Sequence, residues 1–163
     1  MDDFIKDLIE YIKSGLSKDG GFPAKIKVVR AYSKNTEIES PQVSLYVLSD
    51  DDYARSSTFE CETATVYPVQ FYCYWKDGVK YNGNAYGAQL GAELLGEKIS
   101  DLFEDKTTAI DYNNNIKIIQ KIGGAPFGMP VSNGSANYQS VPRFVFTVKK
   151  PYTAINKNKY QEI

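Results

Sequence analysis

The sequence contains no histidine, has only two cysteines and lacks any apolar run long enough to cross a membrane. Histidine is the usual general base near neutral pH and the commonest zinc ligand, so its absence excludes every Ser-His or Cys-His catalytic arrangement. The acidic residues cluster at 50–52, at Glu60 and Glu62, and along one helical face, which are ordinary solvated placements. We therefore expect no catalytic residue, no cofactor and no metal site, and we predict that the protein is not an enzyme.

Three further patterns have simpler interpretations than a ligand site. Cys61 and Cys73 fall in one strand-like segment, where a rise of about 3.3 Å per residue separates them by roughly 40 Å, so we interpret both as small, apolar residues. The triplet at 50–52 lacks the spacing and the distal glutamate of a calcium-binding loop. The glycines within 83–91 match no phosphate-binding pattern, so nucleotide binding has no support.

The charge is nearly balanced, with 19 basic and 20 acidic residues and a formal net charge of -1. Such a chain has no overall basic field, so we expect neither nucleic-acid specificity nor a membrane as partner. Asp2 and Asp3 precede a helical pattern without the basic flank and apolar run of a signal peptide, which predicts assembly in a cytosol. The length of 163 residues suits a single domain, predicted over 1–152, with a polar tail at 153–163.

Two segments have the period of an amphipathic helix. The first covers residues 3–17, and Gly15, followed by Gly20, Gly21 and Pro23, is expected to end it. The second covers 85–104 and contains small residues that would let a neighbouring layer approach closely. The apolar positions are Phe4, Ile5, Leu8, Ile9, Ile12 and Leu16 in the first helix and Ala88, Ala92, Leu95, Ile99, Leu102 and Phe103 in the second, whose small residues are Gly87, Ala88, Gly91, Ala92 and Gly96.

Five segments have the alternation of strands, and the 13 tyrosines favour a β-rich, adhesive protein. Pro68 interrupts the third segment, which indicates a bulge or an edge position. The order helix, three strands, helix, two strands (α-β-β-β-α-β-β) predicts an α+β fold, in which a mostly antiparallel sheet of about five strands packs against two amphipathic helices. The strands are predicted over Ile26–Tyr32, Pro41–Leu48, Glu60–Trp75, Ile116–Ile122 and Val141–Lys149.

Two features suggest contact with another protein. The second helix brings acidic residues together at i, i+4 spacing, either to face a basic partner or as a solvated face. Residues 123–140 are predicted to form an unusually long loop whose apolar side chains make it either a contact loop or a lid over the core. The candidate protein-contact positions are Glu93, Glu97 and Asp101 on the helix and Phe127, Met129 and Tyr138 in the loop.

Five stretches form an ordered pattern along the chain: the helix Phe4–Leu16, the strand Pro41–Tyr46, the tyrosine-rich strand ending at Trp75, the helix Ala88–Phe103, and the closing strand Pro142–Val148 after a long loop. In this order they resemble the tail terminator and tail-completion (head-tail joining) proteins of tailed bacteriophages and related phage-tail-like particles. The resemblance covers most of the chain. The polar extension beyond Tyr152 departs from the family's pattern.

The resemblance implies a structural protein of virion assembly. Its subunits would form a hexameric ring that caps the head-proximal end of the tail tube, stops tail polymerisation and provides the head-joining surface. The implied partners are other copies of this chain, the tail-tube protein and a head-completion or connector protein, and the implied location is the virion tail, after assembly in the host bacterial cytoplasm. The family has no catalytic residues to carry over. In a closed ring, edge strands and long loops would be covered.

Three other interpretations remain open. Another ring-forming head-tail adaptor or completion protein would differ in its binding partner. A monomeric cytosolic ligand-binding domain would use the concave face of the sheet and its tyrosines as a pocket, and its true ligand would raise the thermal midpoint by mass action. An enzyme that uses only carboxylates and tyrosines would need a pocket that buries at least one carboxylate.

Overall fold

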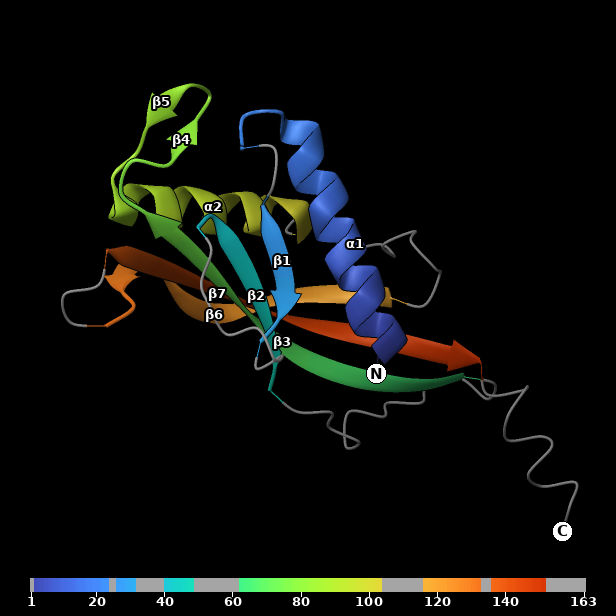
Figure 1. Cartoon of the computed structure of the whole chain (residues 1–163). Coiled ribbons are helices and arrows are strands. Elements are labelled where there is room, and N and C mark those ends of the chain that lie inside the picture. The colour runs from blue at the N-terminus through green and yellow to red at the C-terminus, as the bar shows by residue number, and fades with distance from the viewer. Residues whose placement is uncertain are drawn as a thin grey trace, which may run out of the picture.

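The protein is an α+β fold with two helices on one side of a mostly antiparallel sheet, as the computed structural model in Figure 1 shows. The structure describes residues 2–23, 26–31, 40–48, 62–103, 116–132 and 136–151. Our predictions on the triplet at 50–52, on Glu60, on Cys61 and on the polar tail at 153–163 lie outside these residues.

The predicted order of elements is confirmed, with one small hairpin added between the third strand and the second helix. The main sheet has the strand order β1-β2-β3-β7-β6, in which β1 and β2 are parallel and the other pairs are antiparallel. The elements are α1 (Asp2–Asp19), β1 (Lys27–Arg30), β2 (Gln42–Val47), β3 (Glu62–Lys76), β4 (Lys80–Tyr81), β5 (Asn84–Ala85), α2 (Ala88–Phe103), β6 (Ile116–Pro130) and β7 (Asn137–Pro151).

The hydrophobic core lies between the two helices and the middle of the sheet. Alternate residues of β3 from Val69 to Trp75 are fully buried, as their predicted alternation requires. Phe71 stacks on Phe103 of α2 with ring centroids 5.5 Å apart and meets the rings of β7 edge-on. Burial of each such side chain stabilises the fold by about 1.5–3 kcal/mol, so the central strands carry much of the stability.

Small residues on α2 allow the helix to lie directly on the sheet, as predicted. A Cβ atom added to Gly91 would lie 2.0 Å from Cδ1 of Trp75, and one added to Gly96 would lie 2.4 Å from Oγ of Ser140. Real Cβ contacts are essentially never that short, so a larger residue at Gly91 would have to displace the buried Trp75 ring, and one at Gly96 would have to displace Ser140. Because these glycines lack a side chain, α2 can approach β3 and β7 closely.

Pro68 lies inside β3, where the sequence left a bulge and an edge position as alternatives. The register with β7 is continuous through the pair Pro68↔Val145, so the bulge alternative is wrong. On the other side, the Leu48 N–H donates to the Pro68 carbonyl at 2.8 Å, one position beyond the last β2–β3 pair, Val47↔Val69. Leu48 and Pro68 are therefore direct partners, and proline lacks the N–H that would return a bond to the Leu48 carbonyl, so the β2–β3 ladder ends at this position.

The predicted long loop at 123–140 is wrong. Strand β6 continues to Pro130 and β7 begins at Asn137, so the connection is short. The glycines that suggested a loop belong to a register shift between Lys121 and Gly124, where Gly123 and Gly124 have φ values of 62° and 106°. A Cβ atom on Gly124 would lie 2.5 Å from the Val141 carbonyl oxygen. Glycine is common in loops, but here the two glycines form a bulge within a strand.

Candidate protein-binding surfaces

A cleft of about 700 Å³ is lined by residues of α2 and of the hairpin of β6 and β7. It brings together two features that are far apart in the sequence, the acidic face of α2 and the apolar end of β6. The helical spacing places the three carboxylates on one side of α2, and Phe127 lies on the opposite wall. Its lining residues are Glu93, Gly96, Glu97, Ser100, Asp101, Gly123, Gly124, Phe127, Ser140 and Pro142.

Glu93 differs from the other two acidic residues because it is bound within the chain. Its Oε1 accepts a hydrogen bond of 3.1 Å from the Gly128 N–H. Gly128 itself is buried against α2, where an added Cβ would lie 2.6 Å from the Gln89 carbonyl oxygen. Glu93 therefore holds the end of β6 on the helix, whereas Glu97 and Asp101 are exposed.

Three large apolar side chains on α2 and β6 are exposed, and we call them the apolar rim: Leu90, Phe127 and Met129. Their exposed fractions are 64 % for Leu90, 72 % for Phe127 and 53 % for Met129. Phe127 and Met129 flank the buried Gly128, in a stretch of β6 where the pairing with β7 is irregular between Ala125 and Met129. Grouped apolar exposure of this kind marks an interaction surface.

Tyr138, the remaining predicted contact residue, does not belong to the apolar rim. It is half-buried, packs against the hydrophobic core and pairs with Trp75 across the β3–β7 ladder. For Tyr138 the structure favours the alternative of a lid over the core.

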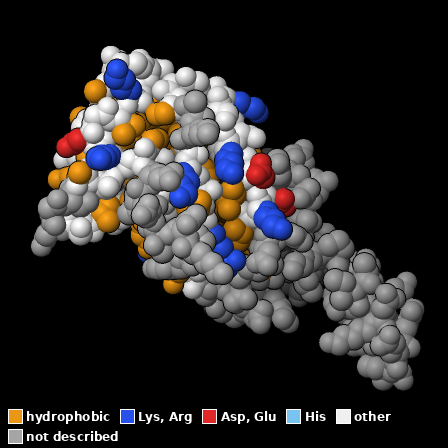
Figure 2. Space-filling model, in the orientation of Figure 1, with side chains coloured by type: hydrophobic (Ala, Val, Ile, Leu, Met, Phe, Trp, Pro, Cys, Tyr) orange, Lys and Arg blue, Asp and Glu red, His pale blue; other side chains and the backbone are white. Residues whose placement is uncertain are grey.

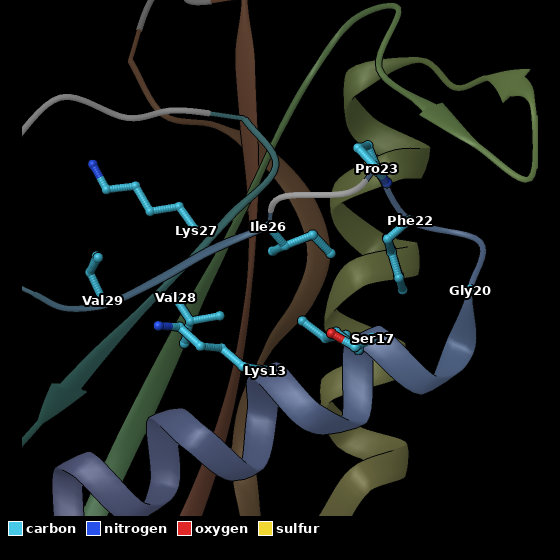
Figure 3. Close-up of a pocket in the computed structure, with 10 residues that line it drawn as sticks. Lys13, Ser17, Gly20, Phe22, Pro23, Ile26, Lys27, Val28 and Val29 are labelled. Atoms are coloured by element: carbon cyan, nitrogen blue, oxygen red, sulfur yellow. The ribbon is translucent and has the colours of Figure 1, made fainter.

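A second groove, of about 710 Å³, lies at the other edge of the sheet between the end of α1 and β1. It includes consecutive residues of β1 and therefore follows this edge strand on both of its faces. In Figure 3, Phe22 and Ile26 lean toward the space between α1 and β1, whereas Lys27 and Val29 project from the other side of the strand. The lining residues are Lys13, Leu16, Ser17, Gly20, Phe22, Pro23, Ile26, Lys27, Val28 and Val29.

The sequence did not point to this groove. Residues 20–23 were interpreted only as the end of a helix. The two lysines of the groove, Lys13 and Lys27, lie in different elements, α1 and β1. Figure 2 shows this face of the molecule with Lys and Arg side chains spread over it, few Asp or Glu, and apolar atoms exposed between them. The available signal was the presence of Lys27 and Arg30 among the apolar residues of 26–30.

A polar network next to the groove joins α1, the β4–β5 hairpin and α2. The Tyr81 hydroxyl donates to Oδ2 of Asp19 at 2.8 Å, and Lys98 Nζ lies 3.9 Å from the other carboxylate oxygen of Asp19. Lys98 also lies 5.9 Å from the centre of the Tyr81 ring. The hydrogen bond to Asp19, with burial, raises the pKa of Tyr81, so this tyrosine is a structural donor at neutral pH.

The described residues do not assemble a reactive centre of the usual kinds. Cys73 is buried, and burial raises the pKa of its thiol, so a reactive thiolate does not form there near neutral pH. Within the same residues, His, Cys, Asp and Glu side chains form no group of three that could hold a metal ion. The cleft is lined by three carboxylates and two apolar side chains, and the groove is lined mainly by apolar side chains with two lysines. Mixed linings of this kind suit contact with another macromolecule.

No protein-family model matches this chain, and a search of curated proteins finds no matching sequence. Neither α1 nor α2, the helices in the described part of the chain, is long and apolar enough to cross a membrane. Support for a function comes from the two surfaces and from the order of elements.

Proposed function

We propose that this chain is a structural assembly protein of a phage tail or phage-tail-like particle, and that it acts as a tail terminator. Copies would form a ring on the head-proximal end of the tail tube, end its growth and provide the surface that joins the head. The observation that carries this proposal is the apolar rim, two of whose residues, Phe127 and Met129, lie on the edge strand β6.

Both edges of the sheet favour association with further copies. Among the described strands, β1 and β6 each have a neighbour on one side only. An unpaired strand edge and an exposed apolar rim are liabilities in an isolated chain, because each can template unwanted association. A ring covers both kinds of surface in every copy, because the contact between neighbours is closed by rotation.

The α+β fold also agrees with the type of subunit that the resemblance implies. The confirmed order α-β-β-β-α-β-β contains the five stretches on which the resemblance rests, although the last loop is shorter than predicted. A ring built from such subunits has two faces, one for the end of the tail tube and one for the head connector.

The first test is the mass of the purified protein across a range of concentrations, alone and mixed with tail-tube protein. A terminator is expected to form a hexamer whose mass does not change with concentration. A stable monomer under both conditions would contradict the ring and would favour the monomeric ligand-binding domain.

The second test is electron microscopy of particles assembled without this protein. We expect headless tails of irregular, excessive length, because nothing ends polymerisation. Tails of normal and uniform length that are joined to heads would overturn the terminator role. Normal tail length without attached heads would instead indicate a head-tail adaptor, the alternative within the same biology.

A further inference from the structure

We infer that the cleft lined by α2 and the β6–β7 hairpin binds the lysine-bearing segment 152–163 of a second copy of this chain. The inference rests on the proposed ring and names a contact that would repeat between its neighbouring subunits. Its support comes from the charge of the cleft, from the apolar side chains beside that charge, and from the distance between the cleft and the end of β7.

Two carboxylates of the cleft are open to a partner. Glu97 and Asp101 lie four positions apart on α2, so they share one side of the helix, and both are exposed. Lys98 interacts with the charge of Asp101, but it pairs with Asp19 and does not line the cleft. No lysine or arginine is among the described residues that form the lining. The cleft therefore favours a cationic ligand.

A mostly buried hydroxyl group lies on the same side of α2. Ser100 is only 7 % exposed and lines the cleft next to Asp101. Its hydroxyl forms no hydrogen bond within the described part of the chain, although it is open to a molecule bound in the cleft. A buried polar group without a partner is unfavourable. An ammonium group has three donors, so it can bind a carboxylate and this hydroxyl together.

The opposite wall of the cleft is apolar. It is formed by Phe127, which is 72 % exposed, and by Pro142. Lysine has a long apolar stem and a charged head, so the stem can lie along this wall while the head reaches the carboxylates. The face of the phenylalanine ring also attracts an ammonium group. The lining thus matches a lysine side chain, whereas no three described His, Cys, Asp or Glu side chains are placed to hold a metal ion.

The chain itself contains a segment of this chemistry. Residues 149–161 include four lysines and no acidic residue. Lys157 and Lys159 are two positions apart, so in an extended segment they would lie on one side, about 6.6 Å apart. Glu97 and Asp101 are separated by about 6 Å along the axis of α2, at a rise of about 1.5 Å per residue. Each lysine can therefore meet one carboxylate.

The cleft of the same chain is out of reach for these lysines. Strand β7 ends at Pro151, and Pro142 of the cleft lies nine positions earlier, or roughly 30 Å back along the strand. Lys157 and Lys159 follow Pro151 by six and eight positions, so a fully extended segment carries them about 20–28 Å. The segment would also use two or more residues to reverse its direction. The lysines therefore stop short of Pro142 in their own chain, whereas the cleft of a neighbouring subunit is not subject to this limit.

Charge reversal tests the contact in the full-length protein. The segment variant carries Lys157→Glu and Lys159→Glu, and the cleft variant carries Glu97→Lys and Asp101→Lys. Native mass spectrometry of mixed light and isotope-labelled assemblies measures how fast subunits exchange between them. Each variant alone brings like charges together, so we expect its subunits to exchange about tenfold faster than wild type, or more.

Two further variants separate the effect of charge from misfolding. Lys6→Glu with Lys80→Glu is the matched control, because it changes the net charge as the segment variant does, at exposed positions outside the cleft. It should exchange at the wild-type rate. If circular dichroism shows that the cleft variant does not fold, Glu97→Gln with Asp101→Asn takes its place. We expect this neutral pair to speed exchange as well, because it removes the charges that bind the lysines.

Mixing shows whether the contact joins two copies. In an equimolar mixture, the reversed segment of one variant meets the reversed cleft of the other, and the two unchanged surfaces also meet. We expect mixed assemblies that contain equal numbers of both variants and exchange as slowly as wild type. A single chain that carries all four reversals should recover in the same way.

Three results would overturn the inference while the proposed function survives. If the segment and cleft variants exchange like wild type, the ring uses another contact. If the chain with four reversals recovers but the mixture does not, the segment binds the cleft of its own chain. If neither recovers although the variants are folded, the two surfaces do not face each other. A wild-type chain that stays monomeric with and without tail-tube protein contradicts the proposed function itself.

Discussion

Phe71 and Phe127 have the same type of side chain, but one is buried and the other is exposed. Phe71 lies at the centre of the sheet, fully buried between β7 and α2, whereas Phe127 lies on the edge strand β6 and is 72 % exposed. Their neighbours differ in the same way, because Phe71 meets three other phenylalanine rings and Phe127 borders a cleft lined by carboxylates. The centre of the sheet thus holds the fold together, and its edge leaves apolar area for a partner.

The largest effect expected from this difference is the loss of the central ring. Phe71→Ala should lower the free energy of unfolding by about 3–5 kcal/mol, because it removes buried area and leaves a cavity in a packed core. Leu90→Ala, on the exposed side of α2, should change it by less than about 0.5 kcal/mol. Urea denaturation of both variants checks this, and similar values for the two would contradict the distinction between centre and edge.

The next effect concerns the contact of α2 with β3. Gly91→Ala should destabilise the protein by about 1–3 kcal/mol, because its Cβ would overlap the Trp75 ring. Gly87→Ala is the control on the same helix end, since its Cβ would lie 3.8 Å from the Asp77 carboxylate oxygen. The control should be neutral or stabilising by up to about 1 kcal/mol. Equal thermal midpoints for the two variants would show that α2 can shift away from the sheet.

A smaller effect is expected at the Tyr81–Asp19 hydrogen bond, between the groove and α2. Tyr81→Phe should cost about 1 kcal/mol at pH 8, where the tyrosine is protonated in both the folded and the unfolded chain. Because the pKa of Tyr81 is raised in the folded protein, the unfolded chain loses its proton first as the pH rises above its ordinary value of about 10. The wild-type advantage is therefore complete below about pH 10 and disappears at higher pH.

Urea denaturation of wild type and Tyr81→Phe at several pH values between 8 and 11 measures this dependence. The difference between the two proteins cancels the titration of the other tyrosines. A difference that stays constant or grows above pH 10 would contradict the role of Tyr81 as a donor to Asp19.

The smallest effect on stability is expected at the edge, where the effect on association should be large. Phe127→Ser should change the free energy of unfolding by less than about 0.5 kcal/mol, because the side chain is mostly exposed. It should nevertheless weaken self-association, because it removes the largest projecting side chain of the apolar rim. Leu48→Ser, at an exposed apolar position outside the rim, is the control. A Phe127→Ser protein that unfolds easily would instead make Phe127 a core residue.

Much of the fold was predictable because its signals are local. The alternation along β3 and the helical periods of α1 and α2 depend on neighbouring residues only, and all three elements occur where they were predicted. The β4–β5 hairpin was missed although its turn, Asn82-Gly83, is a strong local signal, with φ values of 51° and 79°. That error was one of interpretation, because the information was present.

The candidate site was only partly predictable. Glu97, Asp101, Phe127 and Met129 were named from the sequence, and the structure places them around one cleft or on its rim. What could not be foreseen is that Gly128, next to Phe127, binds Glu93, since that contact joins residues 35 positions apart. The groove between α1 and β1 was equally hidden, because its lysines come from different elements.

The sequence by itself determined which segments form helices and strands, which of their faces are apolar, and that no histidine chemistry is available. Each of these follows from residue types and short periods. Only the tertiary structure decided that residues 123–130 are a bulged strand and not a loop, that α1 continues past Gly15 to Asp19, and that the cleft and the groove lie at opposite edges of the sheet. The physical reason is that strand pairing and helix packing join distant segments, so they set positions that no local pattern contains.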